Sequence, residues 1–258
     1  MTTKMLGKEW FHHFAAMKKE PKEIFYRGKP ELLERPKISI VGTRRPTQYT
    51  EHMTVNIAQK LSRAGVVIVS GAAMGVDAQA HYGAGVGNTI AVMANGLNVH
   101  YPATNRELIR GIEREGLALS TYPDDTLAAH WSFVARNEMV VALGDVLIVS
   151  EAERDSGSMR SVAYALKMGK KIYTFPHRAG ESEGSMDLVK KGEAEILYDV
   201  DAFVSRYGQT KMIENDAFLQ FCQTVPSYEA ALKLYGEKVA LYELEGKIAV
   251  KDGRIRIL

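Results

Sequence analysis

A turn of small and hydroxyl-bearing residues at positions 70–81, SGAAMGVDAQAH, has a composition suited to binding an anion. Ser70, Gly71 and Gly75 follow the apolar run 66–69, and the residues after them have helical spacing. The first turn of a helix carries backbone N–H groups that lack partners within the helix, and a phosphate can accept hydrogen bonds from them. Glycine-rich turns also occur in open α/β sheets because they let helices pack on strands, so this turn alone leaves both explanations open.

Two other turns after apolar runs are built from small, hydroxyl-bearing or basic residues: Gly42, Thr43 and Arg44 after residues 38–41, and Ser156, Gly157 and Ser158 after residues 146–150. Serine is one of the commonest helix N-caps, so the second turn fits a plain cap as well as a phosphate site. The carboxyl ends of parallel strands meet at one edge of a sheet, so we expect the three turns to lie together. Their combined composition predicts a phosphate site.

Arg136 and Asn137 are a further candidate pair, on a predicted helix close to Trp131 and Phe133. The arginine could pair with a surface carboxylate, which would contribute little to stability. It could instead bind a phosphate while the aromatic rings stack on bases. The sequence does not decide between these two roles.

Alternating strand-like and helix-like segments position these turns. We expect strands at residues 38–41, 66–69, 89–93, 117–120, 146–150 and 171–175, and helices at residues 48–63, 76–86, 105–115, 133–143 and 158–168. Strict alternation implies a parallel sheet whose right-handed crossovers cover both faces. The strands are β-branched runs without polar alternation, as fully buried strands should be. The predicted fold is a Rossmann-like, doubly wound, mainly parallel α/β domain at residues 37–207.

Residues 1–36 precede this domain and mix apolar, charged and proline residues. Trp10, Phe11 and Phe14 fall at helical spacing, and Ile24-Phe25-Tyr26 is a short apolar run. We expect a short helical extension here, followed by an extended lead-in to the sheet.

The segment 212–258 follows a change of composition at Tyr207-Gly208-Gln209-Thr210. Residues 212–245 have helical spacing, interrupted near Val225-Pro226-Ser227, and Asp252-Gly253 between alternating apolar residues predicts a terminal hairpin. We therefore predict a small winged-helix-like module. Its helices carry many acidic residues, which favours docking or oligomerisation over the reading of bases.

Several classes of function are disfavoured by what the sequence lacks. The formal net charge of +2 is too small to indicate a nucleic-acid-binding protein by itself. No G-x-G-x-x-G and no Walker-type loop occurs, so neither a dinucleotide cofactor nor P-loop hydrolysis is expected. Asp77 and His81 share a helix face, where a capping aspartate and a packed histidine are expected rather than a catalytic pair.

Cysteine content and hydropathy limit the metal sites, the disulfides and the cellular compartment that we expect for this protein. The single cysteine, Cys222, excludes an internal disulfide and a multi-cysteine zinc site, and we expect neither a metal nor a cofactor. No apolar run approaches the roughly 20 residues that span a bilayer. The first residues lack the apolar core of a signal peptide. We expect a cytoplasmic protein that does not bind membranes.

Five successive segments resemble the motifs of one protein family: VGTRRPTQY, SGAAMGVDAQAH, NGLNVHYPATN, ARNE and DSGSMRSVAYA. In order and spacing over residues 38–197 they are similar to the motifs of DNA-processing protein A, also called DprA or Smf. The resemblance implies a bacterial cytoplasmic protein whose Rossmann-like core binds single-stranded DNA. It further implies that the protein protects incoming DNA, loads the RecA recombinase during natural transformation, forms a homodimer and has no catalytic activity.

Motif by motif, the resemblance implies these DNA- or phosphate-binding residues: Gly42, Thr43 and Arg44 at one phosphate; Ser70, Gly71 and Gly75 on the pocket floor; Ser156, Gly157 and Ser158 above it; Arg136 and Asn137 along the groove; and Lys171, His177 and Arg178 on its flank. Thr50 stands where the family usually has glycine, and Glu138 stands where it usually has a basic residue. The acidic side chain would weaken or redirect a DNA contact. The N-terminal region is also short for the extra helical domain that many members carry.

Two other hypotheses compete with this one. The first is a nucleotide phosphoribohydrolase of the lysine-decarboxylase-like type, acting on nucleoside monophosphates through a P-G-G-x-G-T-x-x-E loop. Aligned on Gly157 and Ser158, this chain has Ser161 where that class has its glutamate. The second treats the tail, residues 212–258, as the functional part, a protein-interaction module beside a vestigial pocket.

Overall fold

The computed structural model describes residues 1–208, 216–222, 224–245, 247–251 and 253–257. The chain divides into two compact units, Met1–Gln209 and Thr210–Leu258. The predicted change of composition at Gln209-Thr210, the start of the predicted helical segment at 212–215, and Gly246 and Asp252 of the predicted hairpin lie outside the described residues.

The first unit contains these strands: β1 (Lys4–Met5), β2 (Phe25–Gly28), β3 (Lys37–Val41), β4 (Val67–Ser70), β5 (Thr89–Val92), β6 (Leu117–Ser120), β7 (Val146–Val149), β8 (Ile172–Thr174) and β9 (Glu195–Ile196). Its α-helices are α1 (Gln48–Arg63), α2 (Val76–Ala84), α3 (Arg106–Glu115), α4 (His130–Leu143), α5 (Ser158–Lys167), α6 (Glu183–Lys190) and α7 (Val200–Tyr207). Its 3₁₀ helices are η1 (Lys8–Phe14), η2 (Pro30–Glu34), η3 (Val86–Asn88) and η4 (Ala103–Asn105).

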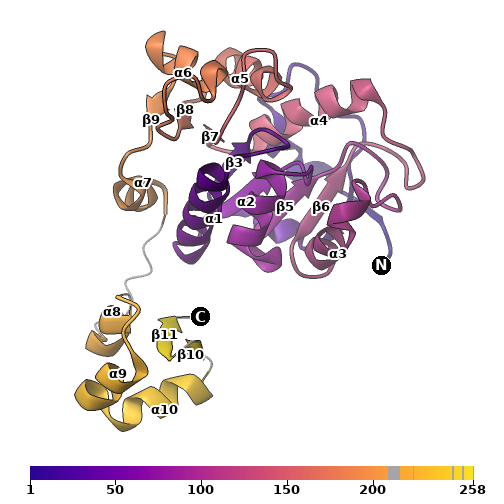
Figure 1. The fold of residues 1–258 in the computed structure, drawn as a ribbon. Coiled ribbons are helices and arrows are strands. Elements are labelled where there is room, and N and C mark those ends of the chain that lie inside the picture. The colour runs from indigo at the N-terminus through magenta and orange to yellow at the C-terminus, as the bar shows by residue number, and fades with distance from the viewer. Residues whose placement is uncertain (209–215, 223, 246, 252, 258) are drawn as a thin grey trace. The chain divides into compact units, whose positions relative to one another are not determined.

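One nine-stranded sheet in the order β1-β2-β6-β5-β4-β3-β7-β8-β9 forms the centre of this unit (Figure 1). The neighbours from β6 to β9 pair in parallel. The chain runs outward from β3 to β6 and then returns to place β7, β8 and β9 on the other side of β3. The predicted Rossmann-like, doubly wound α/β fold is therefore confirmed, and the strand order reverses between β3 and β7.

Helices cover both faces of the sheet. Successive residues of the central strands point to opposite faces and therefore pack in different apolar cores. Ile38 and Ile40 of β3 pack in a core that also contains residues of α1, α2 and α7. Val41 of the same strand belongs to a core that contains residues of α4, α5 and α6. Burial on both faces explains why these strands are continuous apolar runs.

The N-terminal residues add two antiparallel strands to the sheet. The segment around Ile24–Tyr26 is more than the predicted lead-in, because β2 pairs antiparallel with β6, with Phe25 opposite Ser120. Strand β1 then pairs antiparallel with β2. The pairing gives the outer edge of β6 partners for its backbone hydrogen-bonding groups, which would otherwise be exposed to solvent. The 3₁₀ helix η1 buries Phe11 and Phe14 against the same core as α4.

The described residues of the second unit form three short helices, α8 (Ala217–Cys222), α9 (Tyr228–Tyr235) and α10 (Glu237–Leu244), followed by an antiparallel pair, β10 (Ile248–Lys251) and β11 (Arg254–Ile257). Phe218, Cys222 and Val239 are buried in its apolar core. Ser227 caps α9 by accepting a hydrogen bond from the amide of Ala230. Across the described residues, no helix combines the length and apolar character that a membrane span requires.

Candidate nucleic-acid interface

The loops after β3 and β7 lie at the point where the strand order reverses. In open α/β sheets, ligands bind in the crevice outside the carboxyl ends of the strands at such a point. The two loops are joined by a hydrogen bond of 2.9 Å from the Thr43 amide to the Glu151 carbonyl oxygen. The Glu151 carboxylate also accepts hydrogen bonds of 3.0 Å from the amide and hydroxyl of Thr47, the N-cap of α1.

Gly42, Gly71 and Gly75 allow close packing at this point. Gly75 has φ of +74°, which side-chain-bearing residues rarely adopt, and a Cβ there would lie 2.5 Å from the Thr43 carbonyl oxygen. That oxygen accepts a hydrogen bond of 3.1 Å from the Val76 amide. A Cβ on Gly42 would meet Val76, and one on Gly71 would meet the Arg136 guanidinium. These glycines therefore hold the start of α2 against the loop that carries Arg44.

A cleft of about 500 Å³ opens between the strand ends and helices α4 and α5. It is lined by the loop residues Val41 to Arg44, Gly71, Ala73 and Asp155 to Ser158, by Asp77 of α2, by His130, Phe133, Val134, Arg136, Asn137 and Val140 of α4, and by Arg160 and Ser161 of α5. The cleft brings together nine of the fourteen predicted site residues: Gly42, Thr43, Arg44, Gly71, Arg136, Asn137, Ser156, Gly157 and Ser158.

Arg44 is an exposed arginine that lines this cleft. Its guanidinium carbon lies 5.5 Å from the centre of the Phe133 ring, which positions the charge by a cation–π contact. Phe133 itself lies 5.9 Å, centre to centre, from the exposed ring of Tyr101. A basic group and two rings therefore meet at one end of the cleft.

Arg136 is held in a different way, because its side chain is buried, with 7% of the residue exposed. Its Nη1 donates hydrogen bonds to the carbonyl oxygens of Gly71 and Val92, and its Nε donates to Asn137 Oδ1 at 3.1 Å. Asp77 lies beside it, with Oδ2 4.0 Å from Nη1. Burial raises the pKa of the Asp77 carboxyl and lowers the pKa of Arg136, and each charge opposes the shift of the other. Arg136 therefore joins α4 to the ends of β4 and β5 while it lines the cleft.

The start of α5 has serine hydroxyl groups on either side of Gly157, a residue without a side chain. The Ser156 hydroxyl is buried and has no hydrogen-bond partner within the described part of the chain. A Cβ added at Gly157 would meet nothing within 4 Å, so the space in front of this helix end is open. A buried hydroxyl without a partner costs free energy, which a ligand oxygen in the cleft would recover.

The remaining predicted residues lie outside the cleft lining. Ser70 is buried, and its hydroxyl donates to the Ile40 carbonyl oxygen at 2.7 Å. His177 contacts the Ser150 carbonyl oxygen at 2.8 Å through Nε2, and Arg178 beside it is exposed. Lys171 directly precedes β8, so it lies at the amino ends of the strands, at the opposite edge of the sheet.

The two positions that depart from the family pattern have structural partners. Thr50 is buried, and its hydroxyl oxygen lies 3.0 Å from the hydroxyl oxygen of Thr47 at the start of α1. Glu138 accepts a hydrogen bond of 2.8 Å from the Lys18 amide, which ties α4 to the N-terminal segment. Its carboxylate is thus engaged by the backbone of that segment.

Asp77 and His81 do not form a catalytic pair. His81 is completely buried, and its Nδ1 lies 2.7 Å from the Thr89 hydroxyl oxygen. Burial, with a smaller contribution from Arg136, lowers the pKa of His81 to about 3, so the imidazole is neutral at physiological pH. Asp77 accepts a hydrogen bond of 3.3 Å from the Ala73 amide, which fits its predicted capping role.

The cleft lining also includes residues that were not among the predicted site residues, His130, Phe133 and Arg160 among them. Arg160 could have been found, because it follows Gly157 by three residues on a helix and so shares its face. Phe133 and Trp131 were seen only as neighbours of Arg136. Tyr101 belongs to the motif NGLNVHYPATN, but its approach to Phe133 depends on tertiary packing, which the sequence does not show.

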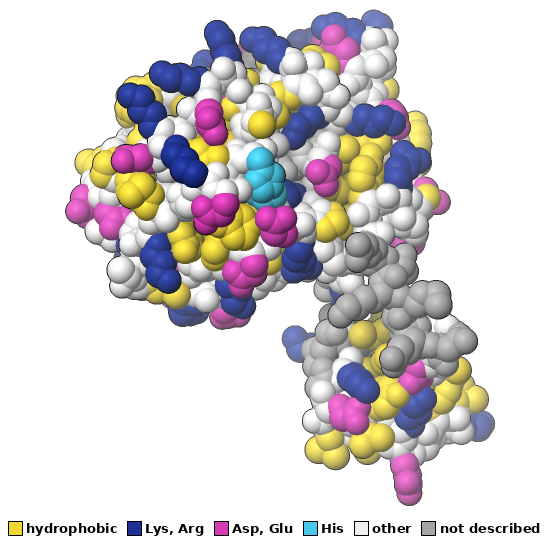
Figure 2. Space-filling view, turned by 180° about the vertical axis from the view of Figure 1, so that it is seen from behind, with side chains coloured by type: hydrophobic (Ala, Val, Ile, Leu, Met, Phe, Trp, Pro, Cys, Tyr) yellow, Lys and Arg dark blue, Asp and Glu magenta, His cyan; other side chains and the backbone are white. Residues whose placement is uncertain are grey.

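Charge is mixed over the face of the molecule in Figure 2, where Lys and Arg side chains alternate with acidic and hydrophobic ones. This agrees with the formal net charge of +2.

Fold and site together define a doubly wound α/β protein with a cleft lined by basic and hydroxyl-bearing side chains at the reversal of strand order. Residues 2–208 match the model of the family described as DNA recombination-mediator protein A, and the chain belongs to this family. The predicted family is therefore confirmed.

Individual relatives are similar over most of this chain. Protein Smf of Synechocystis is 33% identical over 202 residues, which cover 75% of this chain and 50% of the relative. DNA processing protein DprA of Bacillus subtilis is 32% identical over 188 residues, covering 71% of this chain and 63% of the relative. The chain thus spans half to less than two thirds of the length of these relatives. The structure of DNA processing protein A from Helicobacter pylori, described by its single-stranded DNA binding mode, superimposes with a TM-score of 0.77 at 37% identity, covering 80% of this chain and 95% of that one.

Proposed function

We propose that this chain binds single-stranded DNA, with one backbone phosphate in the cleft between Arg44 and the start of α5. The observation that carries the proposal is the Ser156 hydroxyl, which is buried in the cleft wall and has no partner in the described structure. The open space at Gly157 lets a phosphate oxygen reach it. The start of a helix adds backbone N–H groups and the positive end of its dipole.

The aromatic rings beside Arg44 suit the bases of a single strand. Phe133 and Tyr101 are close enough to form one surface, and Trp131, 64% exposed, lies with its ring centre 5.6 Å from that of Tyr122. Bases stack on such rings whatever their sequence, because every base has a π-face. Paired bases in a duplex are stacked on each other and are not available in this way. We therefore propose a preference for single strands without strong base specificity.

The finer proposal is that the protein protects incoming DNA and loads the RecA recombinase on it, as a homodimer and without catalysis. Membership of a recombination-mediator family supports the recombinase step. Two features of the cleft lining support the non-enzymatic role: Asp77 is paired with Arg136, and Ser161 stands where the hydrolase motif has its glutamate. Recombinase loading is tested by strand exchange on DNA coated with single-strand binding protein.

Replacing Arg44 by alanine tests the DNA site. Binding of a fluorescent oligodeoxythymidylate, measured by anisotropy at several salt concentrations, should weaken at least tenfold, about 1.4 kcal/mol. The slope of log affinity against log salt should also fall by about 0.7, the contribution of one neutralised phosphate on a single strand. Arg45→Ala is the matched control, because Arg45 is the adjacent exposed arginine and does not line the cleft.

Equal losses for the two variants would mean that the chain binds DNA through diffuse charge. An unchanged affinity for Arg44→Ala would move the DNA site elsewhere. Phe133→Ala adds a second readout, because loss of stacking should weaken binding while leaving the salt slope unchanged. An excess of unlabelled duplex should compete poorly with the labelled single strand.

A further inference from the structure

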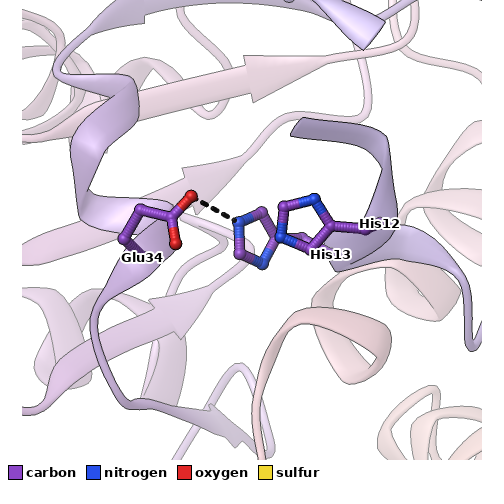
Figure 3. A group of neighbouring side chains, drawn as sticks. All are labelled: His12, His13 and Glu34. Atoms are coloured by element: carbon purple, nitrogen blue, oxygen red, sulfur yellow. Dashed lines mark ion pairs between the residues drawn. The ribbon is translucent and has the colours of Figure 1, made fainter. Parts of the chain in front are cut away.

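A cluster of His12, His13 and Glu34 lies outside the cleft, in the N-terminal part of the first unit (Figure 3). The two histidines come from η1 and the glutamate ends η2, so the cluster joins two segments separated by β2. One potential ligand atom from each residue lies within 4.8 Å of the other two. Figure 3 shows the imidazole rings side by side, with the Glu34 carboxylate facing His13.

His12 is held in the tautomer that leaves its other nitrogen free for a ligand. Its Nδ1 lies 2.8 Å from the Glu9 carbonyl oxygen. A carbonyl oxygen can only accept, so Nδ1 donates this hydrogen bond, and Nε2 is the ring nitrogen that can bind a metal. Metal-binding histidines commonly donate their second ring nitrogen to a backbone carbonyl in this way, which fixes the orientation of the ring.

His13 has a nitrogen whose surroundings are incomplete. Its Nε2 is shielded from solvent and makes no hydrogen bond to the described residues. The Glu34 Oε1 atom lies 3.5 Å away, beyond normal hydrogen-bond distance. Two ligands of one tetrahedral zinc ion, at their usual bond lengths of about 2.0–2.1 Å, lie about 3.4 Å apart. The spacing of these two atoms is therefore that of ligands sharing a metal ion.

We infer that His12, His13 and Glu34 bind a transition-metal dication of the zinc class, with water completing the coordination. Two imidazoles and a carboxylate suit Zn²⁺, Ni²⁺, Co²⁺ and Cu²⁺, and they are a poor set for Mg²⁺ or Ca²⁺, which prefer oxygen ligands. Glu34 is 60% exposed in its side chain, so water reaches the open coordination position. The bound ion would join η1 to η2 and so fasten the segment that flanks β2.

Burial, followed by the positive charge of Lys37 and then His12, lowers the pKa of His13, and Glu34 opposes this. The positive charge of Lys37 opposes the binding of a metal ion at this cluster. Its ammonium group is held by two backbone carbonyl oxygens, because it donates hydrogen bonds of 2.6 Å to that of Leu33 and 3.0 Å to that of Arg35.

Trp10 provides a local probe for this site, because its ring lies 6.2 Å, centre to centre, from that of His13. The chain has two tryptophans, so Trp131→Phe leaves Trp10 as the single emitter. Protein without a polyhistidine tag is titrated with Co²⁺, whose binding should quench Trp10 to saturation at one equivalent and develop visible absorption of a tetrahedral site. Added Zn²⁺ should displace Co²⁺ and restore the fluorescence.

His12→Ala and Glu34→Gln should each raise the Co²⁺ concentration for half-saturation at least tenfold. Both residues are exposed, so these variants should fold, which circular dichroism verifies. His52→Ala, at an exposed histidine on α1, is the matched control and should leave the titration unchanged. An unquenched Trp10, or equal effects of His12→Ala and His52→Ala, would overturn the assignment. Neither outcome depends on DNA binding, so this inference and the proposed function fail independently.

Discussion

Arg44 and Arg136 bring the same charge to one cleft but are held differently. Arg44 is exposed and contacts the Phe133 ring, so its side chain can move to a ligand at little cost. Arg136 is buried and already donates to two carbonyl oxygens and to Asn137. We therefore assign the adjustable phosphate contact to Arg44 and the shaping of the cleft wall to Arg136.

His81 should make the stability of the fold sensitive to acid. The pKa of His81 is about 3 in the folded protein, against an ordinary value of 6.5. Below pH 6.5 the unfolded chain therefore binds a proton at His81 that the folded chain does not bind. The contribution of His81 to stability is present above pH 6.5 and is lost as the pH falls towards 3, at about 1.4 kcal/mol per pH unit at most.

The His81→Asn variant should show a shallower loss of stability between pH 6.5 and pH 4 than the wild type. Asparagine cannot titrate, and its amide can keep the contact with the Thr89 hydroxyl that His81 Nδ1 makes at 2.7 Å. Urea denaturation across this range gives the comparison. Parallel pH profiles for the two proteins would contradict a buried neutral histidine.

Helix α4 connects the cleft to the N-terminal segment, because its two sides have different partners. Phe133, Arg136 and Asn137 line the cleft, whereas Glu138 accepts the hydrogen bond from the Lys18 amide. Displacement of this helix would therefore disturb the cleft even if no DNA-contacting residue were changed.

Arg136→Leu should destabilise the protein by about 3–5 kcal/mol, because it leaves Asp77 as a buried carboxylate without its cation. The carbonyl oxygens of Gly71 and Val92 also lose their donor. Arg160→Leu, on the exposed side of the same cleft, should change stability by no more than about 0.5 kcal/mol. Urea denaturation distinguishes them, and equal stabilities would show that the Arg136–Asp77 pair is not needed for folding.

At the scale of the whole molecule, the first unit should fold and bind DNA without the second. It contains the nine-stranded sheet and the entire cleft, and the family model matches residues 2–208. A fragment of residues 1–208 should therefore bind the fluorescent single strand within about threefold of the full chain, a difference of less than 1 kcal/mol.

Anisotropy titrations of fragment and full chain under the same salt conditions test this prediction. A loss of more than tenfold, in a fragment with native circular dichroism, would mean that the segment after residue 208 contributes to the DNA site. Unchanged DNA binding with lost recombinase loading would support the hypothesis that this segment is an interaction module.

The central fold could be predicted because local and tertiary requirements agree there. Residues 48–63 were predicted as a helix and form α1 with those bounds, since apolar spacing and the Thr47 cap act within one segment. The segment that forms β2 was predicted only as an extended run. Its partner β6 lies about 90 residues later in the chain, and the two pair because the edge of β6 needs hydrogen-bonding partners, which no local sequence pattern indicates.

The candidate site was partly predictable for the same reason. Residues 42–44 and 156–158 follow strands directly, and the topology of the sheet alone brings them together. The burial of Arg136 could not be read from residue type, since a surface arginine and a buried one look alike in sequence. Lys171 precedes its strand instead of following it, so its exclusion from the cleft could have been inferred from the predicted strand at residues 171–175.

The shortness of the outermost strands affects how copies of this protein can meet. The sheet ends on one side in β1 and on the other in β9, and each of these strands has two residues. A long unpaired edge is a template on which another chain adds a strand, and short edges remove that template. Edges as short as these disfavour edge-to-edge aggregation. We therefore expect copies of the sheet unit to contact each other through packed side-chain surfaces and not through an intermolecular sheet.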